Sequence, residues 1–177
     1  MEPLRIDVTE IREELGAHIS VQRSVDLGAL AVAQIEFTPM GPGSVDISIL
    51  NTGTGLVAQG RVNATVRTEC ARCLEPFDLD IEVAVETFYA DREEAQLLDE
   101  DVDWEPIESG SIDLAPAIQA AVTVDLPFAP VCADDCRGIC PTCGNNLNET
   151  ACMCASSETS PPSPFSALKD LFPGGET

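Results

Sequence analysis

Residues 45–68 read Val-Asp-Ile-Ser-Ile-Leu-Asn-Thr-Gly-Thr-Gly-Leu-Val-Ala-Gln-Gly-Arg-Val-Asn-Ala-Thr-Val-Arg-Thr, and residues 79–86 read Leu-Asp-Ile-Glu-Val-Ala-Val-Glu. Both stretches place an apolar residue at almost every second position. A period of two is typical of half-buried β-strands, because an amphipathic helix would space its apolar residues three or four apart. The glycine-rich turn 51–55 and the corner 70–77 separate three such runs. The pattern predicts an antiparallel meander of three strands with one face in water.

The eight cysteines of the chain lie in closely spaced groups. The first residues carry neither the basic nor the apolar region of a signal peptide, so we expect a cytoplasmic protein with reduced thiols. Clustered cysteines in that setting indicate a metal site, and four thiolates about 2.3 Å from one ion suit Zn²⁺. The Cys-x-x-Cys pairs at 70–73 and 140–143 can each direct two sulfurs at one ion. We predict one or two structural Zn²⁺ ions, held by two sets of ligands: Cys70, Cys73, Cys132 and Cys136, and Cys140, Cys143, Cys152 and Cys154.

Two alternatives to metal binding stay open at this point. The cysteines could form disulfides, or Cys70 and Cys73 could carry out thiol–disulfide exchange. Neither a serine–histidine pair with a positioning acid nor a histidine-based metal triad is present in the sequence, which has a single histidine, His18. We therefore predict no catalytic residues and no enzyme activity.

The charge of the chain is strongly negative. It has 31 acidic and 9 basic residues, for a net charge of −22. Nucleic-acid binders build their affinity from Lys and Arg on phosphates, so we expect no bulk nucleic-acid binding and a basic protein as the partner. Residues 75–113 hold 15 acids and one base, Arg92. This stretch is either a solvated surface or a docking face, whose candidate partner-binding residues are Glu100, Asp101, Asp103, Glu105 and Glu108.

Weaker patterns surround the meander. We expect helices over Thr9–Gly16, Asp91–Asp99, Asp113–Val122 and Phe165–Phe172, a strand over 17–25 and an exposed acidic loop over Glu100–Glu108. Thr9 and Asp113 can cap their helices. No apolar run approaches the 18 residues of a membrane span. The predicted fold class is α+β: an antiparallel, barrel-like or strongly curved sheet with a few helices and a C-terminal zinc-knuckle module. We divide the chain into a β-rich domain (1–130), a cysteine-rich zinc module (131–154) and a Pro-rich linker with a short terminal helix (155–177).

Three motifs resemble one known family. Residues 70–77 read Cys-Ala-Arg-Cys-Leu-Glu-Pro-Phe, residues 136–148 read Cys-Arg-Gly-Ile-Cys-Pro-Thr-Cys-Gly-Asn-Asn-Leu-Asn, and residues 163–171 read Ser-Pro-Phe-Ser-Ala-Leu-Lys-Asp-Leu. Their sequences and order resemble the YceD family, the large ribosomal RNA subunit accumulation proteins. The resemblance implies a non-enzymatic factor for large-subunit (23S) ribosomal RNA. Together with the charge it favours a ribosomal protein or a ribosome-assembly intermediate as partner. A zinc-binding adaptor without a ribosomal role is the remaining alternative.

Overall fold

The computed structural model describes residues 1–97 and 102–156. Its centre is a meander of three long antiparallel strands, β5 (Gly43–Asn51), β6 (Leu56–Glu69) and β7 (Pro76–Ala90). The three strands are in register so that Val45 lies opposite Val62 and Val62 opposite Val83, and all three side chains are buried. The opposite face of the meander is polar and exposed. The meander predicted from the period of two is confirmed.

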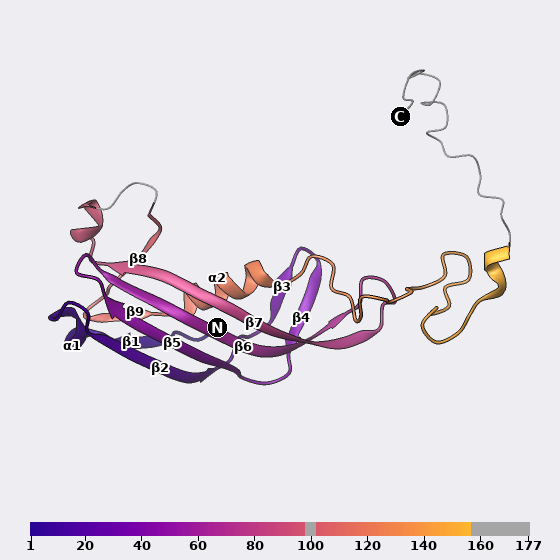
Figure 1. Cartoon of the computed structure of the whole chain (residues 1–177), viewed down its shortest axis with the longest axis horizontal. Coiled ribbons are helices and arrows are strands. Elements are labelled where there is room, and N and C mark those ends of the chain that lie inside the picture. Colours follow the sequence, from indigo (N-terminus) through magenta and orange to yellow (C-terminus); the bar gives the residue numbers. More distant parts are fainter. Residues whose placement is uncertain (98–101, 157–177) are drawn as a thin grey trace, which may run out of the picture.

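Further strands widen this sheet on both sides. Strand β2 (His18–Val25) pairs antiparallel with β5, as the pattern of residues 17–25 predicts. The hairpin of β3 (Leu30–Val32) and β4 (Ile35–Pro39) joins the far half of β6 through β4. Strand β8 (Trp104–Pro106) lies parallel to the end of β7. Among the described residues these seven strands form one sheet, and Figure 1 shows it as a long, twisted layer.

The sheet is open, so the predicted barrel-like closure is wrong. Within the described part of the chain β2 pairs only with β5, and β7 pairs only with β6 and β8. The apolar face is covered instead by helix α2 (Ala115–Asp125) and by a small ribbon of β1 (Arg5–Asp7) and β9 (Ser111–Asp113). This cover buries residues such as Ile118, Leu114 and Ile112 against the sheet. Because the cover already removes the apolar face from water, closure of the strands would bury little more of it.

Two of the four predicted helices are present in modified form. The N-cap residue of α2 is Leu114, so the prediction that Asp113 caps this helix is wrong; Asp113 lies one residue earlier, where its carboxylate accepts the backbone N–H of Ala115 at 2.9 Å. The helix runs three residues past the predicted end. Helix α1 (Thr9–Arg12) is only one turn long and Thr9 does not cap it. The predicted longer helix fails because the buried side chain of Asn51 donates its amide N–H groups to the carbonyl oxygens of residues 11, 12 and 14, which a continuing helix would need.

The remaining predicted elements lie at the limits of the described residues or outside them. Within Asp91–Asp99 a 3-10 turn, η1 (Glu94–Leu97), replaces the predicted helix, and a second such turn, η2 (Met153–Ser156), ends the described chain. The linker from residue 157 and the terminal helix Phe165–Phe172 lie outside the described residues. Within the described part, no helix is long and apolar enough to cross a membrane.

The two ends of the sheet carry different features. Figure 1 shows β6 and β7 running almost its full length, with β8 and α1 near one end and residues 131–156 beyond the other. The cysteines lie at the second end, and the acidic residues around β8 lie at the first.

Candidate metal centre

The first Cys-x-x-Cys pair forms the tight turn between β6 and β7. The backbone N–H of Cys70 donates to the carbonyl of Glu75 at 2.9 Å, and that of Leu74 donates back to the carbonyl of Cys70 at 2.9 Å. Cys70 is fully buried and Cys73 is only 4% exposed. The turn therefore directs both sulfurs inward, where Phe77 packs against them.

The segment after α2 brings two further cysteines to this turn. The backbone N–H of Ala71 donates to the carbonyl of Pro130 at 2.7 Å, and that of Ile139 donates to the carbonyl of Arg72 at 3.1 Å. Between these contacts Cys132 and Cys136 lie beside the first pair. Gly138 adopts φ +71°, and a Cβ atom there would lie 3.0 Å from the carbonyl oxygen of Arg72. A glycine is thus required for the tail to approach the turn this closely. We call the four cysteines the corner group: Cys70, Cys73, Cys132 and Cys136.

The second Cys-x-x-Cys pair repeats the backbone of the first. The N–H of Cys140 donates to the carbonyl of Asn145 at 2.8 Å, and that of Gly144 donates to the carbonyl of Cys140 at 2.8 Å. The residue after the second cysteine has a positive φ in both turns, +62° at Leu74 and +73° at Gly144. This turn gathers the tail group: Cys140, Cys143, Cys152 and Cys154. The structure thus assembles the eight cysteines in the two sets that their spacing predicts.

The sulfur positions fit a tetrahedral ion. In each group the four sulfur atoms all lie within 4.8 Å of one another. In the corner group the sulfurs of Cys70 and Cys136 are 3.8 Å apart, as are those of Cys73 and Cys132. Four thiolates at about 2.3 Å from a tetrahedral Zn²⁺ ion are separated by about 3.8 Å. The geometry of the corner group is therefore consistent with metal binding.

Several N–H groups point at the corner sulfurs. The backbone N–H groups of Arg72 and Cys132 each lie 3.4 Å from the sulfur of Cys70. The side-chain amide of Asn148 donates to the sulfur of Cys136 at 3.3 Å, and its oxygen accepts the backbone N–H of Arg137. Such donors stabilise thiolates and orient metal ligands. Asn148 was not predicted as a site residue, although the Asn-Asn-Leu-Asn run after the second Cys-x-x-Cys pair was a visible signal.

The thiols do not ionise together. Burial acts to raise the pKa of Cys70, but hydrogen bonds from the backbone amides of Cys73 and Cys132 contribute to lowering it to about 6. Backbone N–H groups of its own turn lower the pKa of Cys140 to about 6. Hydrogen bonding to a neighbouring thiol raises the pKa of Cys154 to about 11. Because adjacent thiolates repel one another, a divalent cation is needed to ionise all four sulfurs of a group.

The structure does not favour the redox alternative for Cys70 and Cys73. A thiol–disulfide enzyme needs an accessible attacking thiolate, and both of these side chains are buried. The pair also connects antiparallel strands, whereas thioredoxin-like motifs open a helix after a strand. In the corner group the sulfur atoms of Cys70 and Cys136, and those of Cys73 and Cys132, are 3.8 Å apart, well beyond the S–S bond length of about 2.05 Å, so the geometry does not favour disulfides there either.

Three of the five candidate partner-binding acids lie at the opposite end of the sheet. Asp103, Glu105 and Glu108 are exposed, whereas Glu100 and Asp101 lie outside the described residues. The predicted acidic loop over Glu100–Glu108 is corrected in part. Glu105 belongs to β8, and Glu108 forms a two-way backbone pair with Ser111 that closes a tight turn. The intervening Ser109 and Gly110 both have positive φ, as hairpin turns of this kind require.

Comparisons with known proteins identify the family of this chain. A family model described as "Large ribosomal RNA subunit accumulation protein YceD" matches residues 58–172, which include all eight cysteines. The chain belongs to the YceD family. An uncharacterised protein of Mycobacterium leprae is 30% identical over 148 residues, covering 82% of this chain and 68% of the relative. An uncharacterised protein of Mycobacterium tuberculosis is 31% identical over 147 residues, covering 80% of this chain and 70% of the relative.

A plant relative extends the YceD comparison to chloroplasts. The Arabidopsis thaliana protein named large ribosomal RNA subunit accumulation protein YCED homolog 1, chloroplastic, is 27% identical over 172 residues. The alignment covers 81% of this chain and 54% of the plant protein. No solved structure matches the chain. The YceD resemblance of the cysteine motifs is thus confirmed, and the family is named for accumulation of large-subunit ribosomal RNA.

Proposed function

We propose that this YceD protein is a non-enzymatic cytoplasmic factor that supports the synthesis, processing or stability of large-subunit ribosomal RNA. The observation that carries the proposal is the family match over residues 58–172. The net charge of −22 favours action through a basic ribosomal protein or an assembly intermediate rather than through direct contact with RNA phosphates.

The acidic surface supports contact with a basic protein. Asp103, Glu105 and Glu108 are exposed near β8, and no ion pair in the described part of the structure engages them. Their charges are therefore available to a partner. Attraction of this kind raises the rate of encounter and falls with salt, because exposed charges are screened beyond about 8–10 Å at physiological ionic strength.

The zinc proposal assigns one structural Zn²⁺ to each group of cysteines. Four sulfurs per ion leave no open coordination position for a substrate, which fits a structural and not a catalytic metal. Protein purified under reducing conditions should contain two zinc ions per chain by mass spectrometry. A measured content of one zinc ion per chain would support only one of the two cysteine groups as a metal site. Protein that lacks zinc and contains disulfides after expression in a reducing cytoplasm would contradict the assignment.

The partner proposal is tested in cells that lack the gene. The acidic variant replaces Glu100, Asp101, Asp103, Glu105 and Glu108 with Gln or Asn. The matched control removes as many charges elsewhere, at Glu2, Glu10, Glu13, Glu36 and Glu149, all of them exposed. We measure the ratio of large- to small-subunit ribosomal RNA and identify crosslinked proteins at low and high salt. We expect the acidic variant to lower both the ratio and the recovery of ribosomal proteins. Equal recovery and equal salt dependence for all three proteins would show that the acids form a solvated surface only.

A further inference from the structure

Strand β7 has an unpaired outer edge. Beyond its short pairing with β8 at residues 88–90, no strand in the described part of the chain covers that side of β7. The bond from the N–H of Cys70 to the carbonyl of Glu75 makes these two residues a hydrogen-bonded pair, and such pairs alternate along an antiparallel ladder. The even-numbered residues of β7 therefore direct their N–H and C=O groups outward. The carbonyl of Ala90 agrees, since it accepts the N–H of Ile107 on that outer side.

A groove follows this free edge. It has a volume of about 570 Å³ and lies between β7, at residues such as Val83 and Ala84, and helix α2. The helix wall is made largely of small side chains, including Ala117 and Ala121. Val124 also lines the groove and is 84% exposed. An added strand would place alternate side chains against this apolar wall.

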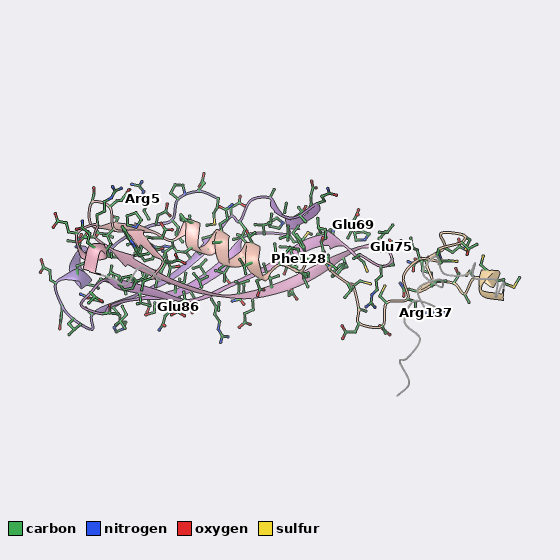
Figure 2. The ribbon with its side chains drawn as sticks, turned by 90° about the horizontal axis from the view of Figure 1, so that it is seen from above. Arg5, Glu69, Glu75, Glu86, Phe128 and Arg137 are labelled. Atoms are coloured by element: carbon green, nitrogen blue, oxygen red, sulfur yellow. The ribbon has the colours of Figure 1, made fainter. Side chains whose placement is uncertain are left out.

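The charge around the groove is acidic. Glu86, Glu105 and Asp125 line it, and no basic residue does. Two other acids of β7 already have basic partners, because Asp78 pairs with Arg67 at 2.7 Å and Glu82 pairs with an arginine of β6. The three acids of the groove have no ion-pair partner within the described residues. Figure 2 shows Glu86 on the β7 side of the molecule.

We propose that the outer edge of β7 binds an extended basic segment of a partner protein as an additional strand. Its backbone pairs with even-numbered residues of β7, and its apolar side chains face α2. Its Lys or Arg side chains lie on the opposite, exposed face beside Glu86, and the charges of Glu105 and Asp125 at the groove add to the attraction. The required ligand is thus a segment in which apolar and basic residues alternate. A second copy of this chain fits poorly, since it would place the acids of β7 against one another. The proposal rests on the proposed function, because it names the docking site for the basic partner.

The test uses a fluorescent eight-residue peptide in which lysine and valine alternate. Its binding to the full chain is measured by anisotropy at low and at physiological salt. The variant Ala84→Pro removes one outward N–H and leaves the pairing with β6 intact, whereas Ala84→Val keeps that N–H. We expect Ala84→Pro to weaken binding at least tenfold and Ala84→Val less than twofold. A peptide in which glutamate and valine alternate should not bind.

A second variant tests the same proposal without introducing a proline into β7. Glu86, Glu105 and Asp125 are all exposed, so their joint replacement by lysine should preserve the fold. This variant should no longer bind the lysine peptide and should bind the glutamate peptide instead. Hydrogen exchange should show slower exchange of β7 amides when the lysine peptide binds. Unchanged affinity in both variants, or a wild-type dimer that Ala84→Pro converts to monomer, would overturn the proposal.

The cellular experiment separates this inference from the proposed function. If wild-type protein recovers no ribosomal proteins, the proposed function fails whatever the peptide does. If wild-type protein recovers them and Ala84→Pro recovers them equally, the partner binds elsewhere and only the β7 edge is rejected. Loss of recovery in Ala84→Pro and retention in Ala84→Val supports both.

Discussion

Replacement of Cys143 by serine removes one of the four sulfurs of the tail group at an exposed position. Few other interactions stabilise the segment around Cys143. Ile139 is 39% exposed and Met153 is 94% exposed, so burial contributes little. Five backbone hydrogen bonds organise residues 140–150. We therefore expect Cys143→Ser to disorder residues 140–154 and to leave the sheet folded.

The magnitude follows from the structure. Ordering the fifteen residues 140–154 costs about 15–22 kcal/mol, at roughly 1–1.5 kcal/mol each. Five backbone hydrogen bonds return about 5 kcal/mol at roughly 1 kcal/mol each. The shortfall of about 10–17 kcal/mol matches the apparent binding free energy of structural Zn²⁺, about 10–16 kcal/mol. Metal binding is therefore sufficient to fold the segment, and without it the segment should unfold.

The assay is amide hydrogen exchange combined with zinc analysis. Cys143→Ser should reduce the zinc content from two ions per chain to one and abolish protection over residues 140–150, with protection in β6 unchanged. Thr142→Ser is the matched control, because it alters an exposed side chain of the same turn and removes no sulfur. Retained protection over residues 140–150 in Cys143→Ser would refute the reasoning. Equal loss of protection in the control would refute it as well.

Of four further substitutions, three test the fold by urea unfolding, and Gly144→Leu tests the tail group by its zinc content. Asn51→Ala should destabilise the protein by about 2–4 kcal/mol, because it leaves three carbonyl groups at the end of α1 without their donor. Leu74→Gly should stabilise it by up to about 1 kcal/mol through relief of a positive φ, and Gly144→Leu should weaken zinc retention in the tail group for the converse reason. Gly60→Ala should cost about 3 kcal/mol, because its Cβ would lie 2.1 Å from the carbonyl oxygen of Asp46 and force β5 and β6 apart.

The sequence was sufficient for features that depend on local spacing. The period of two in residues 45–86 predicted the meander, since one buried face fixes which side each residue takes. Cysteine spacing predicted both groups, because a Cys-x-x-Cys turn brings its own two sulfurs together whatever surrounds it. Helix α2 was predicted close to its observed start, because its signals, the acidic Asp113 just before the helix and Pro116 in its first turn, lie within a few residues of one another.

Features that depend on distant contacts could not be predicted in this way. The early end of α1 is caused by the side chain of Asn51, some forty residues away. The open sheet results from α2 and the β1–β9 ribbon covering its apolar face, and strand periodicity contains no information on that cover. Glu105 was expected in a loop because three residues, Trp104–Pro106, are too few to show a strand pattern.

The corner group and the groove along β7 are connected through one short segment. Leu126 is buried at the end of α2, and four residues later the carbonyl of Pro130 accepts the N–H of Ala71 in the first cysteine turn. Cys132 follows, and its sulfur atom lies 3.8 Å from the sulfur atom of Cys73. The end of the helix that forms one wall of the groove is therefore fixed to the β6–β7 turn by the corner group. Loss of metal there would loosen this wall, whereas loss of metal from the tail group would leave it in place, because the tail group lies beyond the corner along the chain.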